Sequence, residues 1–474
     1  MRVEPRLSRG LRDLLPEQML ARQRMVDTIR GVYEIYGFSP LETPAVEYLD
    51  VLSGSAGEEA QQSIFRVTNP EEEALGLRFD LTVPLSRVVS QYQQELVLPF
   101  RRYQVSSVWR ADKPEAGRFR EFMQFDLDSV GAPSEVADTE IMAAMCDTLE
   151  ALQVGPYRVR FSSRKILNLL LKHAAIPEGQ GADVFRVLDK LDKIGFPKVR
   201  LELTSGYTDE SGDRIRGVGL TSQQVDKIEH FLAIQGDRDE VLARLMELFA
   251  AVEGAAGDLE VIRRISSHLN ALGYLSDRIA LDLSIARGLA YYTGPIFEAN
   301  LLDAPEFGSV FGGGRYDDLV RRFTGQSIPA TGASVGVDRL LAALLKLNRI
   351  TVRKTATQVL VTAMDADLMG EYLKITYELR RAGICTEIHV GQPKRLGKQL
   401  QRADRLEIPY VVIMGSDEAA RSVVTVKEMG EGREKTAGVT AHEQWKAARF
   451  GQQEVARSEL VATLKGLLAS HKQE

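Results

Sequence analysis

The stretch at 103–131 alternates apolar and polar residues so regularly that it constrains the fold more than any other part of the chain. It predicts a β-hairpin with strands at 104–110 and 120–130, joined by a loop at 111–118 that contains proline and glycine. Alternate side chains of a strand point to opposite faces. One face of the second strand is therefore apolar, and the other carries a ring, an amide and two carboxylates: Phe122, Gln124, Asp126 and Asp128.

This polar face has two interpretations, and the alternation alone does not decide between them. Antiparallel strands with one buried and one wet face are common. A wet face usually carries Lys, Thr, Ser or Glu, whereas this one combines Gln with two Asp beside a loop rich in basic residues. The second interpretation is therefore that the hairpin forms the floor of a site for a cationic ligand.

Length and composition are those of an ordinary soluble protein with room for about three domains. The net charge of −6 argues against a surface that binds nucleic acid throughout, but it is compatible with a local basic patch. Cys146 and Cys385 lie far apart in apolar patterns, so we expect two buried free thiols and no structural metal. The chain has no signal-peptide core and no apolar run of about 18 residues, which predicts a cytoplasmic protein without membrane contact.

Strand and helix signals divide the chain into regions of different character. Residues 1–348 predict an α+β unit built on a mainly antiparallel sheet, interrupted at 165–275 by successive amphipathic helices that form a mostly helical insertion. A linker at 349–357 leads to residues 358–474, where strands and helices alternate as in a compact α/β domain with a partly parallel sheet. The last part, about 442–470, predicts an amphipathic helical tail.

Arginines accompany carboxylates or polar residues on three of the predicted strands. These groups are Arg78 with Asp80 and Thr82 on one face of a strand at 77–83, Arg110 beside the polar face of the hairpin, and the region around Arg287, with Arg315 and Arg339 following later. Buried charges are costly without partners, and a single such pair is usually a structural ion pair. Three on one antiparallel sheet favour a site that binds a phosphate and an ammonium group together, because the planar arginine fork bonds two phosphate oxygens at once. The six histidines are scattered, which argues against histidine-based catalysis or metal binding.

The glycine run FGGGRYDD at 311–318 is not a phosphate-binding loop. It has neither the Gly-x-Gly-x-x-Gly spacing after a strand nor a Gly-Lys-Ser/Thr ending. The three glycines instead predict a close approach between backbones or an unusual turn.

Together these blocks resemble the class II aminoacyl-tRNA synthetases, and among them the histidyl-tRNA synthetase family. The hairpin resembles motif 2, FSPLETPAVE with Pro44 resembles the dimer-interface strand of motif 1, and ASVGVDRLLAAL with Arg339 resembles motif 3. SIARGLAYYTGPIFE and GGGRYDDL are similar to the two histidine-specific blocks, LRFDLTVPL to the histidine-pocket strand, and KRLGKQLQRADRLEIPYVVIMG to the C-terminal anticodon-binding domain. The resemblance covers nearly the whole chain and implies a class II catalytic domain at 1–348 and an anticodon-binding domain at 358–474.

The resemblance also implies roles for the residues at matching positions. Arg110, Arg287 and Arg339 would be the catalytic arginines on the ATP phosphates, with Arg110 on the α-phosphate and Arg287 also near the substrate carboxylate. Phe122 would stack on adenine, and Asp112 would lie near the base and ribose. The residues that would bind histidine are Asp80, Thr82, Gln124, Asp128, Tyr291 and Tyr292.

The activity implied is ATP-dependent activation of L-histidine to histidyl-adenylate, followed by transfer to the 3′ end of tRNA-His. ATP would enter with Mg²⁺, and the protein would be a homodimer. From residue 351 onward basic residues slightly outnumber acidic ones in an otherwise acidic chain, which suits contact with tRNA. The residues expected at that contact are Lys394, Arg395, Lys398 and Arg402, although a solvated helix face explains any one of them equally well.

Two other functions stay open. One is a non-catalytic synthetase-like regulator, such as the regulatory subunit of ATP phosphoribosyltransferase, and the other is a tRNA-sensing module without activity. The regulator usually lacks the C-terminal domain that this chain has. Three positions also depart from the family's pattern: Asp112 where many members have Glu, Ala290 where an acid is usual, and Glu115 in the motif 2 loop, which leaves open how the tRNA acceptor end is read.

Overall fold

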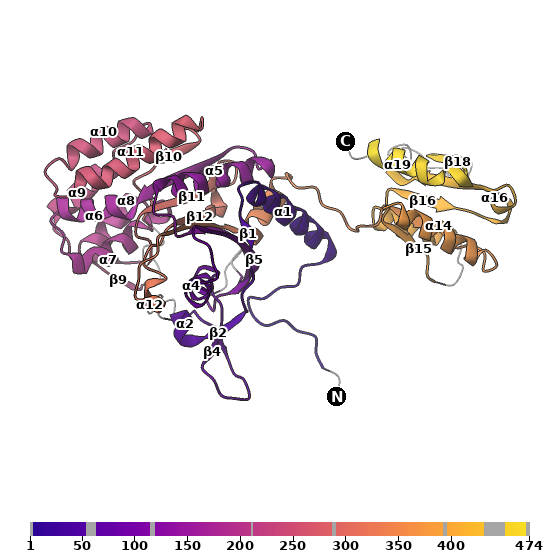
Figure 1. The fold of residues 1–474 in the computed structure, drawn as a ribbon, viewed down its shortest axis with the longest axis horizontal. Coiled ribbons are helices and arrows are strands. Elements are labelled where there is room, and N and C mark those ends of the chain that lie inside the picture. The colour runs from indigo at the N-terminus through magenta and orange to yellow at the C-terminus, as the bar shows by residue number, and fades with distance from the viewer. Residues whose placement is uncertain are drawn as a thin grey trace. The chain divides into compact units, whose positions relative to one another are not determined.

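The computed structural model describes most of the chain, namely residues 3–53, 63–113, 119–209, 212–286, 291–391, 396–430 and 451–470. The chain forms two compact units, a larger one of Met1–Asp13 with Arg22–Ile350 and a smaller one of Leu14–Ala21 with Thr351–Glu474 (Figure 1). Within the described residues, no helix combines the length and the apolar character that a membrane span requires. The domain limits expected from the sequence stay predictions.

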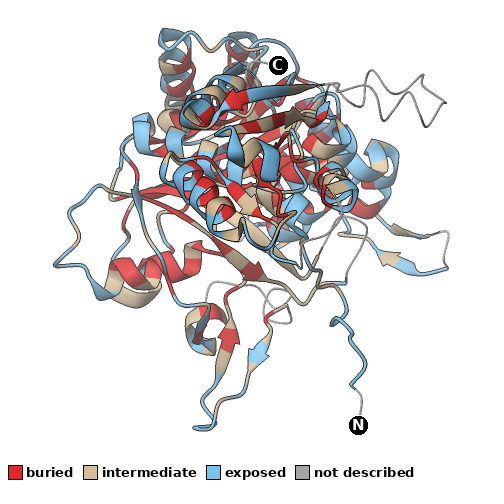
Figure 2. Cartoon of the chain, turned by 90° about the vertical axis from the view of Figure 1, so that its right-hand side faces the viewer, coloured by how far each residue is buried: buried red, intermediate tan, exposed pale blue. Residues whose placement is uncertain are grey.

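An eight-stranded sheet organises the larger unit. In sheet order its strands are β1 (Ser39–Pro40), β5 (Phe100–Trp109), β6 (Glu121–Val130), β13 (Ala330–Gly336), β12 (Ser309–Arg315), β11 (Pro295–Leu301), β7 (Tyr157–Ser163) and β10 (Ile279–Leu281). Neighbours pair antiparallel except at the two edges, where β1–β5 and β7–β10 are parallel. The predicted mainly antiparallel sheet is confirmed, and buried residues follow its strands (Figure 2).

The predicted hairpin is formed by β5 and β6, but both faces of β6 are buried. Phe125 and Leu127 are fully buried on one face, and Asp126 and Asp128 on the other are only 2% and 3% exposed. The interpretation of this face as a wet surface is therefore wrong. Buried polar groups require hydrogen-bond partners, so this face of the hairpin is the first place to look for a site.

The strand predicted at 77–83 is wrong in its extent. The strand β4 ends at Leu77, and the helix α4 (Thr82–Gln91) begins five residues later. The Asp80 carboxylate accepts a hydrogen bond from the backbone N–H of Val83 at 3.0 Å, and this local bond competes with a β-ladder. Asp80 and Thr82 therefore stand at the entrance of a helix and do not share one strand face with Arg78.

A small three-stranded sheet lies next to this helix entrance. Its strands, in order, are β2 (Val46–Tyr48), β4 (Leu75–Leu77) and β3 (Arg66–Val67). The remaining short elements and helices outside the helical insertion are α1 (Pro16–Ile35), α2 (Leu49–Ser53), α5 (Glu135–Ala151), the 3₁₀ turn η1 (Pro305–Phe307), α12 (Arg321–Thr324) and α13 (Val337–Lys346). Helix α5 packs on the large sheet through β13, β12, β11 and β7, and this leaves the opposite face of the sheet for the site.

The segment between β7 and β10 is mostly helical, as predicted. Its elements are α6 (Arg164–His173), α7 (Glu178–Leu188), α8 (Leu191–Leu203), the hairpin of β8 (Gly206–Thr208) and β9 (Arg214–Arg216), α9 (Ser222–Leu232), α10 (Arg238–Leu248) and α11 (Ala255–Ala271). Thr221 and Asp237 start α9 and α10 with capping boxes, which satisfy backbone N–H groups that the first helical turn leaves unpaired.

The smaller unit is a partly parallel α/β domain, as predicted. Its sheet runs β15 (Thr386–Ile388), β14 (Val359–Val361), β16 (Tyr410–Ile413), β17 (Val423–Glu428) and β18 (Gln452–Ala456), with the first three strands parallel and the last two antiparallel. The helical elements are α14 (Met369–Arg381), α15 (Leu396–Arg405), α16 (Ser416–Ala420), the 3₁₀ turn η2 (Arg457–Glu459) and α19 (Leu460–Ser470).

Two expectations for this unit are wrong. Residues 452–456 form the edge strand β18 and not part of a helical tail, while residues 431–450 lie outside the described residues. The last part of the predicted tail is helical, as α19, and its Leu460, Leu464 and Leu468 are buried in the core of the unit. Cys146 is buried as predicted, but Cys385 is exposed since it lies just before β15.

Candidate active site

The polar face of the hairpin continues across the sheet into β13. Arg102 and Asp128 are cross-strand partners, and Asp128 in turn lies opposite Gly332 of β13. A Cβ atom on Gly332 would be 2.0 Å from Oδ1 of Asp128. The close backbone approach predicted for the glycine run is found at Gly313, where an added Cβ would be 2.1 Å from the Gly332 carbonyl oxygen, whereas at Gly332 the space is filled by a carboxylate.

An ion pair and a hydrogen bond hold the Asp128 carboxylate. Nη2 of Arg102 lies 2.9 Å from Oδ2, and the hydroxyl of Tyr316 donates a hydrogen bond to Oδ1. Burial raises the pKa of Asp128, while the Arg102 charge and the Tyr316 hydrogen bond act in the opposite direction. Asp128 is thus an oriented carboxylate whose charge depends on Arg102.

Asp126 and Gln124 complete the polar row of β6. Burial raises the pKa of Asp126 to about 7, with Arg102 opposing and Asp128 adding to the shift. Oδ2 of Asp126 is 4.0 Å from Nη2 of Arg102, and its Oδ1 has no hydrogen-bond partner among the described residues. Gln124 donates from Nε2 to Oγ of Ser334 at 2.7 Å, which leaves its side-chain carbonyl unpaired within the same part of the structure.

Asp80 and a tyrosine pair close one side of this row. Burial raises the pKa of Asp80, and the charges of Arg110 and Arg102 lower it, so both guanidinium groups are near. The rings of Tyr291 and Tyr292 are 4.6 Å apart. Burial raises the pKa of Tyr292 to about 12, and the nearby carboxylates, including that of Asp80, add to this shift. The structure thus brings Asp80, Asp126 and Asp128 together in one buried cluster, which we call the acidic pocket.

Arg110 stands at the open end of the hairpin. Its Nε donates to the carbonyl of Phe79 at 3.0 Å, and its guanidinium carbon lies 5.1 Å from the centre of the Phe122 ring. Asp112, two residues on, accepts a hydrogen bond from the hydroxyl of Ser63 at 2.7 Å. A half-buried cation and an aromatic face, next to a carboxylate, form a suitable place for a nucleotide.

Arg339 lies at the start of α13, where a second contact ties the helix to β6. Nη1 of Arg339 donates to the carbonyl of Ser309 at 2.8 Å. The neighbouring Asp338 accepts from the backbone N–H of Met123 at 2.6 Å and from Nη2 of Arg12 at 2.9 Å. Asp338 and Arg12 were not among the predicted site residues, and they join the N-terminal segment, the hairpin and the arginine-bearing helix.

Some predicted residues fall elsewhere. Arg287, Lys394 and Arg395 lie outside the described residues, as do Glu115 and Ala290. Thr82 opens α4 and is half-buried, and its side chain forms no hydrogen bond with the other described residues. In the smaller unit, Lys398 is exposed on α15, and Arg402 pairs with Glu387 at 2.5 Å.

Arg102 and Tyr316 are the main residues that sequence analysis missed. The signal for Arg102 was available, because it continues the alternation of Ser106 and Gln104 towards the N-terminus by one further step. Tyr316 directly follows the glycine run, yet nothing in that run indicates that its hydroxyl reaches a carboxylate on another strand.

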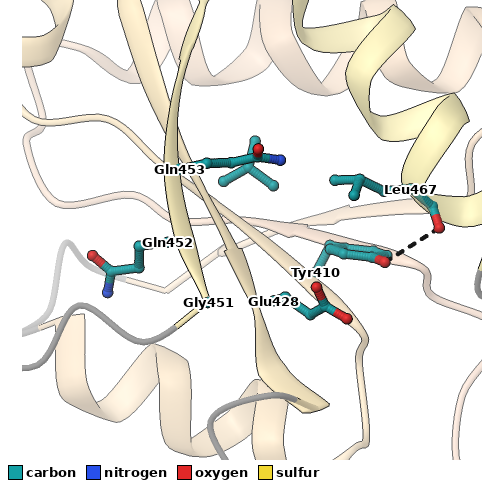
Figure 3. A pocket seen from close by; sticks show the side chains of 7 residues that line it. Tyr410, Glu428, Gly451, Gln452, Gln453 and Leu467 are labelled. Carbon is teal, nitrogen blue, oxygen red and sulfur yellow. Dashed lines mark hydrogen bonds between the residues drawn. The ribbon is translucent and has the colours of Figure 1, made fainter.

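A separate cavity of about 230 Å³ lies in the smaller unit (Figure 3). Its walls include Tyr410, Glu428 and Leu467, and the Tyr410 hydroxyl donates to the Leu467 carbonyl at 3.3 Å. None of the predicted site residues lines it, and it is bordered by Gly451, where the undescribed segment 431–450 ends. It is therefore not the candidate active site.

The Gly332–Asp128 contact yields a direct prediction. Replacing Gly332 with Ala should push the Asp128 carboxylate from its position, because the added methyl group would overlap it. We expect an increase of about 10- to 100-fold in the KM of the amino-acid ligand, equivalent to about 1.4–2.8 kcal/mol. Gly257→Ala is the control, since an added Cβ there meets nothing within 4 Å. Equal ligand KM values in both variants would contradict the assignment.

A mainly antiparallel sheet with this hairpin, a glycine-rich strand pair and an arginine at the start of α13 defines the catalytic fold of class II aminoacyl-tRNA synthetases. The sequence model of histidyl-tRNA synthetase matches residues 10–340, and that of the anticodon-binding domain matches residues 358–467. The chain therefore belongs to the histidyl-tRNA synthetase family.

Similar proteins extend over the full length. The histidine–tRNA ligase of Rhizobium rhizogenes is 41% identical, with 100% of this chain and 97% of the relative covered, and that of Paracoccus denitrificans is 44% identical, with 97% of each covered. The histidyl-tRNA synthetase structure from a Nostoc species has a TM-score of 0.81 at 33% identity and covers 98% of this chain and 99% of its own. A Bacillus halodurans structure described as an ATP phosphoribosyltransferase regulatory subunit/histidyl-tRNA synthetase, with a TM-score of 0.69 at 21% identity over 83% of this chain and 95% of its own, is alike in fold alone.

Proposed function

We propose that this chain is a histidine–tRNA ligase, which activates L-histidine with ATP and transfers the histidyl group to tRNA-His. The observation that carries the proposal is the buried acidic pocket of Asp80, Asp126 and Asp128, which adjoins the Arg110 guanidinium. An amino acid with an ammonium group and an imidazole suits the carboxylates, and a phosphate suits the arginine. The full-length relatives favour this enzyme over the regulatory alternative.

In this proposal, side chains of the acidic pocket bind the imidazole and the ammonium group of histidine. Asp128 and Gln124 bind the imidazole nitrogens, while Asp80 and Thr82 hold the ammonium group. Tyr291 and Tyr292 close the pocket from the side. A site whose buried polar groups pair with imidazole rejects an apolar amino acid by roughly 10⁴-fold, because those groups would lose their partners.

The arginines supply the electrostatic part of the chemistry. A carboxylate oxygen of histidine forms a bond to the α-phosphorus of ATP as the bond to pyrophosphate breaks. Arg110 neutralises charge on the α-phosphate, Arg339 holds the outer phosphates, and Arg287 is assigned to the α-phosphate and the histidine carboxylate. In the second step a 3′-terminal ribose hydroxyl of tRNA attacks the histidyl carbonyl, and AMP leaves. Positioned cations of this kind typically contribute about 3–4 kcal/mol each, so no protein nucleophile is required.

Mg²⁺ is expected to enter with the nucleotide. Within the described part of the chain, no group of three or more His, Cys, Asp or Glu side chains is arranged to hold a metal ion. Mg²⁺ is commonly bound through substrate phosphates with several waters and only one or two carboxylates. We therefore assign Mg²⁺ to the ATP phosphates.

We assign a cytoplasmic location to the protein. We assign the contact with tRNA to its smaller unit, with Lys394, Arg395, Lys398 and Arg402 as the candidate contact residues.

A second copy of the chain is the other proposed partner. The edge strand β1 leaves one side of the large sheet unpaired among the described strands, and Val46 and Tyr48 of β2 are exposed nearby in sequence. We predict a homodimer, and sedimentation equilibrium at micromolar concentration tests it. A mass that stays at 52.6 kDa across the concentration range would exclude the dimer.

Histidine-dependent exchange of pyrophosphate into ATP tests the proposed activity. We expect exchange with L-histidine and none above background with leucine or without an amino acid. Aminoacylation of a tRNA-His transcript then tests the second step. A regulator or a tRNA sensor would show no exchange while a known active synthetase does so under the same conditions, and that result would refute the enzyme.

A further inference from the structure

Arg102 is the most deeply buried cation next to the acidic pocket. It is 0% exposed, and its Nη2 contacts Oδ2 of Asp128 at 2.9 Å and the carbonyl of Leu81 at 3.1 Å. The same nitrogen is 4.0 Å from Oδ2 of Asp126. A charge without access to water is tolerated only where partners surround it, so an arginine at this position depends on the neighbouring carboxylates.

Three buried carboxylates surround the single positive charge of Arg102. Asp80, Asp126 and Asp128 are all buried, and Arg102 lowers the pKa of each of them against the effect of burial. Asp128 receives the direct contact, whereas Asp126 stands further away. Removing the Arg102 charge would leave several carboxylates in a low-dielectric pocket with less compensation, and the cheapest response of such groups is to take up protons.

Unpaired polar atoms collect on the same face. Nε and Nη1 of Arg102, Oδ1 of Asp126, and the side-chain carbonyl oxygens of Gln104 and Gln124 have no hydrogen-bond partner among the described residues. Gln104 is 1% exposed and lies directly across the ladder from Asp126. A mixture of buried unpaired donors and acceptors is uncommon in folded proteins and indicates a polar ligand or water that supplies the partners.

We propose that Arg102 and Asp126 are positioning residues for histidine specificity: Arg102 holds Asp128 ionised and oriented towards the imidazole, and Asp126 is the counter-charge that makes a buried arginine tolerable there. The proposal rests on the proposed function, since the ligand is histidine. Tyr316 donates to Oδ1 of Asp128, whereas Oδ2 lies beside the Arg102 charge without a hydrogen-bond partner among the described residues, which leaves Oδ2 to accept from an imidazole N–H.

The test measures KM for histidine and KM for ATP separately, by pyrophosphate exchange, in a set of Arg102 and Asp126 variants. Arg102→Met should raise the histidine KM by about 100-fold or more, the size expected for a broken buried ion pair, with the ATP KM within about threefold of the wild type. Arg102→Lys should recover about tenfold of that loss, because an ammonium group restores the charge without the fork. The double variant Arg102→Met/Asp126→Asn should bind histidine at least fivefold better than Arg102→Met, since it removes the carboxylate that Arg102 no longer balances.

Arg238→Met is the matched control. Arg238 is 2% exposed and buried among groups of the helical insertion, with hydrogen bonds to the Ser266 hydroxyl and the Ile279 carbonyl. This variant should lower the melting temperature without changing the histidine KM. If Arg102→Met behaves in the same way, Arg102 is an ordinary structural residue and the proposal fails.

Two further outcomes keep the proposal decidable. If Arg102→Met does not fold, the Asp126→Asn variant alone tests the proposal. A rise of about 3- to 10-fold in the histidine KM, equivalent to about 0.6–1.4 kcal/mol, with an unchanged ATP KM supports the proposal. An unchanged histidine KM overturns the proposal. Calorimetric titration of the wild type with histidine distinguishes failure of the proposed function from failure of the roles proposed for Arg102 and Asp126. A wild type that neither binds histidine nor exchanges pyrophosphate would refute the proposed function, whereas an active wild type with unaltered variants would refute the present proposal alone.

Discussion

Replacing Arg110 with alanine is expected to lower histidine-dependent pyrophosphate exchange by about three orders of magnitude while the protein stays folded. Arg110 is held by the Phe79 carbonyl at 3.0 Å and is only half-buried, so its removal costs few native contacts. Its charge, however, faces the pocket and lowers the pKa of Asp80. If Arg110 meets the α-phosphate as proposed, its loss should affect kcat more than either KM, because additional charge develops at phosphorus in the transition state.

Arg101→Ala is the control for this experiment. Arg101 lies in β5, which ends just before Arg110, and it pairs with Glu140 at 2.9 Å and with the Tyr36 carbonyl at 2.8 Å. We expect a loss of stability of about 1–2 kcal/mol and exchange within about threefold of the wild type. Exchange by Arg110→Ala at more than a tenth of the wild-type rate would show that the phosphate is held elsewhere.

The sequence predicts the fold well where periodicity is strong. The β5–β6 hairpin and the helices between β7 and β10 appear where alternation or helical spacing placed them. The strand predicted at 77–83 failed because Asp80 bonds to the backbone of Val83, and no pattern of hydrophobicity reveals such a local bond. The helix predicted at 452–456 is wrong because β18 gains its stability by pairing with β17, which is a tertiary effect, whereas the helix at 460–470 is present.

For the candidate site, the sequence revealed residue types but not their burial. Gln124, Asp126 and Asp128 were placed on one face correctly, yet the sequence left open whether water covers them. The answer depends on β13, whose Gly332 lets the Asp128 side chain lie over the neighbouring strand. Arg102 was missed because it follows Arg101 and looks like part of an exposed basic pair. The two arginines in fact point to opposite faces and have opposite environments, 0% exposed for Arg102 and half-buried for Arg101.

Burial of this face also bears on specificity. A carboxylate at a protein surface accepts any cation, whereas Asp128 is approached by Tyr316 on one oxygen and Arg102 on the other, so only a donor from a limited direction fits. Rejection of the wrong amino acid then follows from the cost of leaving buried groups unpaired and not from the strength of one contact. Asp128 is therefore the residue whose loss should have the most specific effect on histidine.

We expect Asp128→Ala to raise the histidine KM by about 1,000-fold and to lower the free energy of unfolding by about 3–5 kcal/mol, because it leaves the buried Arg102 charge without its direct partner. Asp128→Asn keeps the side-chain volume and an oxygen acceptor. Its effect on stability should be smaller, but the charge that orients the imidazole is gone, and we expect a rise of about 100-fold in the histidine KM. In both variants the KM for ATP should change little, since Phe122 and Arg110 lie near the loop end of the hairpin, six residues along β6 from Asp128 in the case of Phe122.

Asp138→Asn separates loss of stability from loss of recognition. Asp138 is also a buried carboxylate on an arginine, at 2.7 Å from Nη2 of Arg315, and burial raises its pKa to about 6 despite the Arg315 charge. The variant breaks a comparable ion pair on α5, so it should lose stability as Asp128→Asn does while the histidine KM stays within about twofold of the wild type. If both asparagine variants shift the histidine KM equally, the effect comes from a loosened sheet and Asp128 does not read the imidazole. If only the Asp128 variants shift it, the carboxylate between Tyr316 and Arg102 is the group that selects histidine.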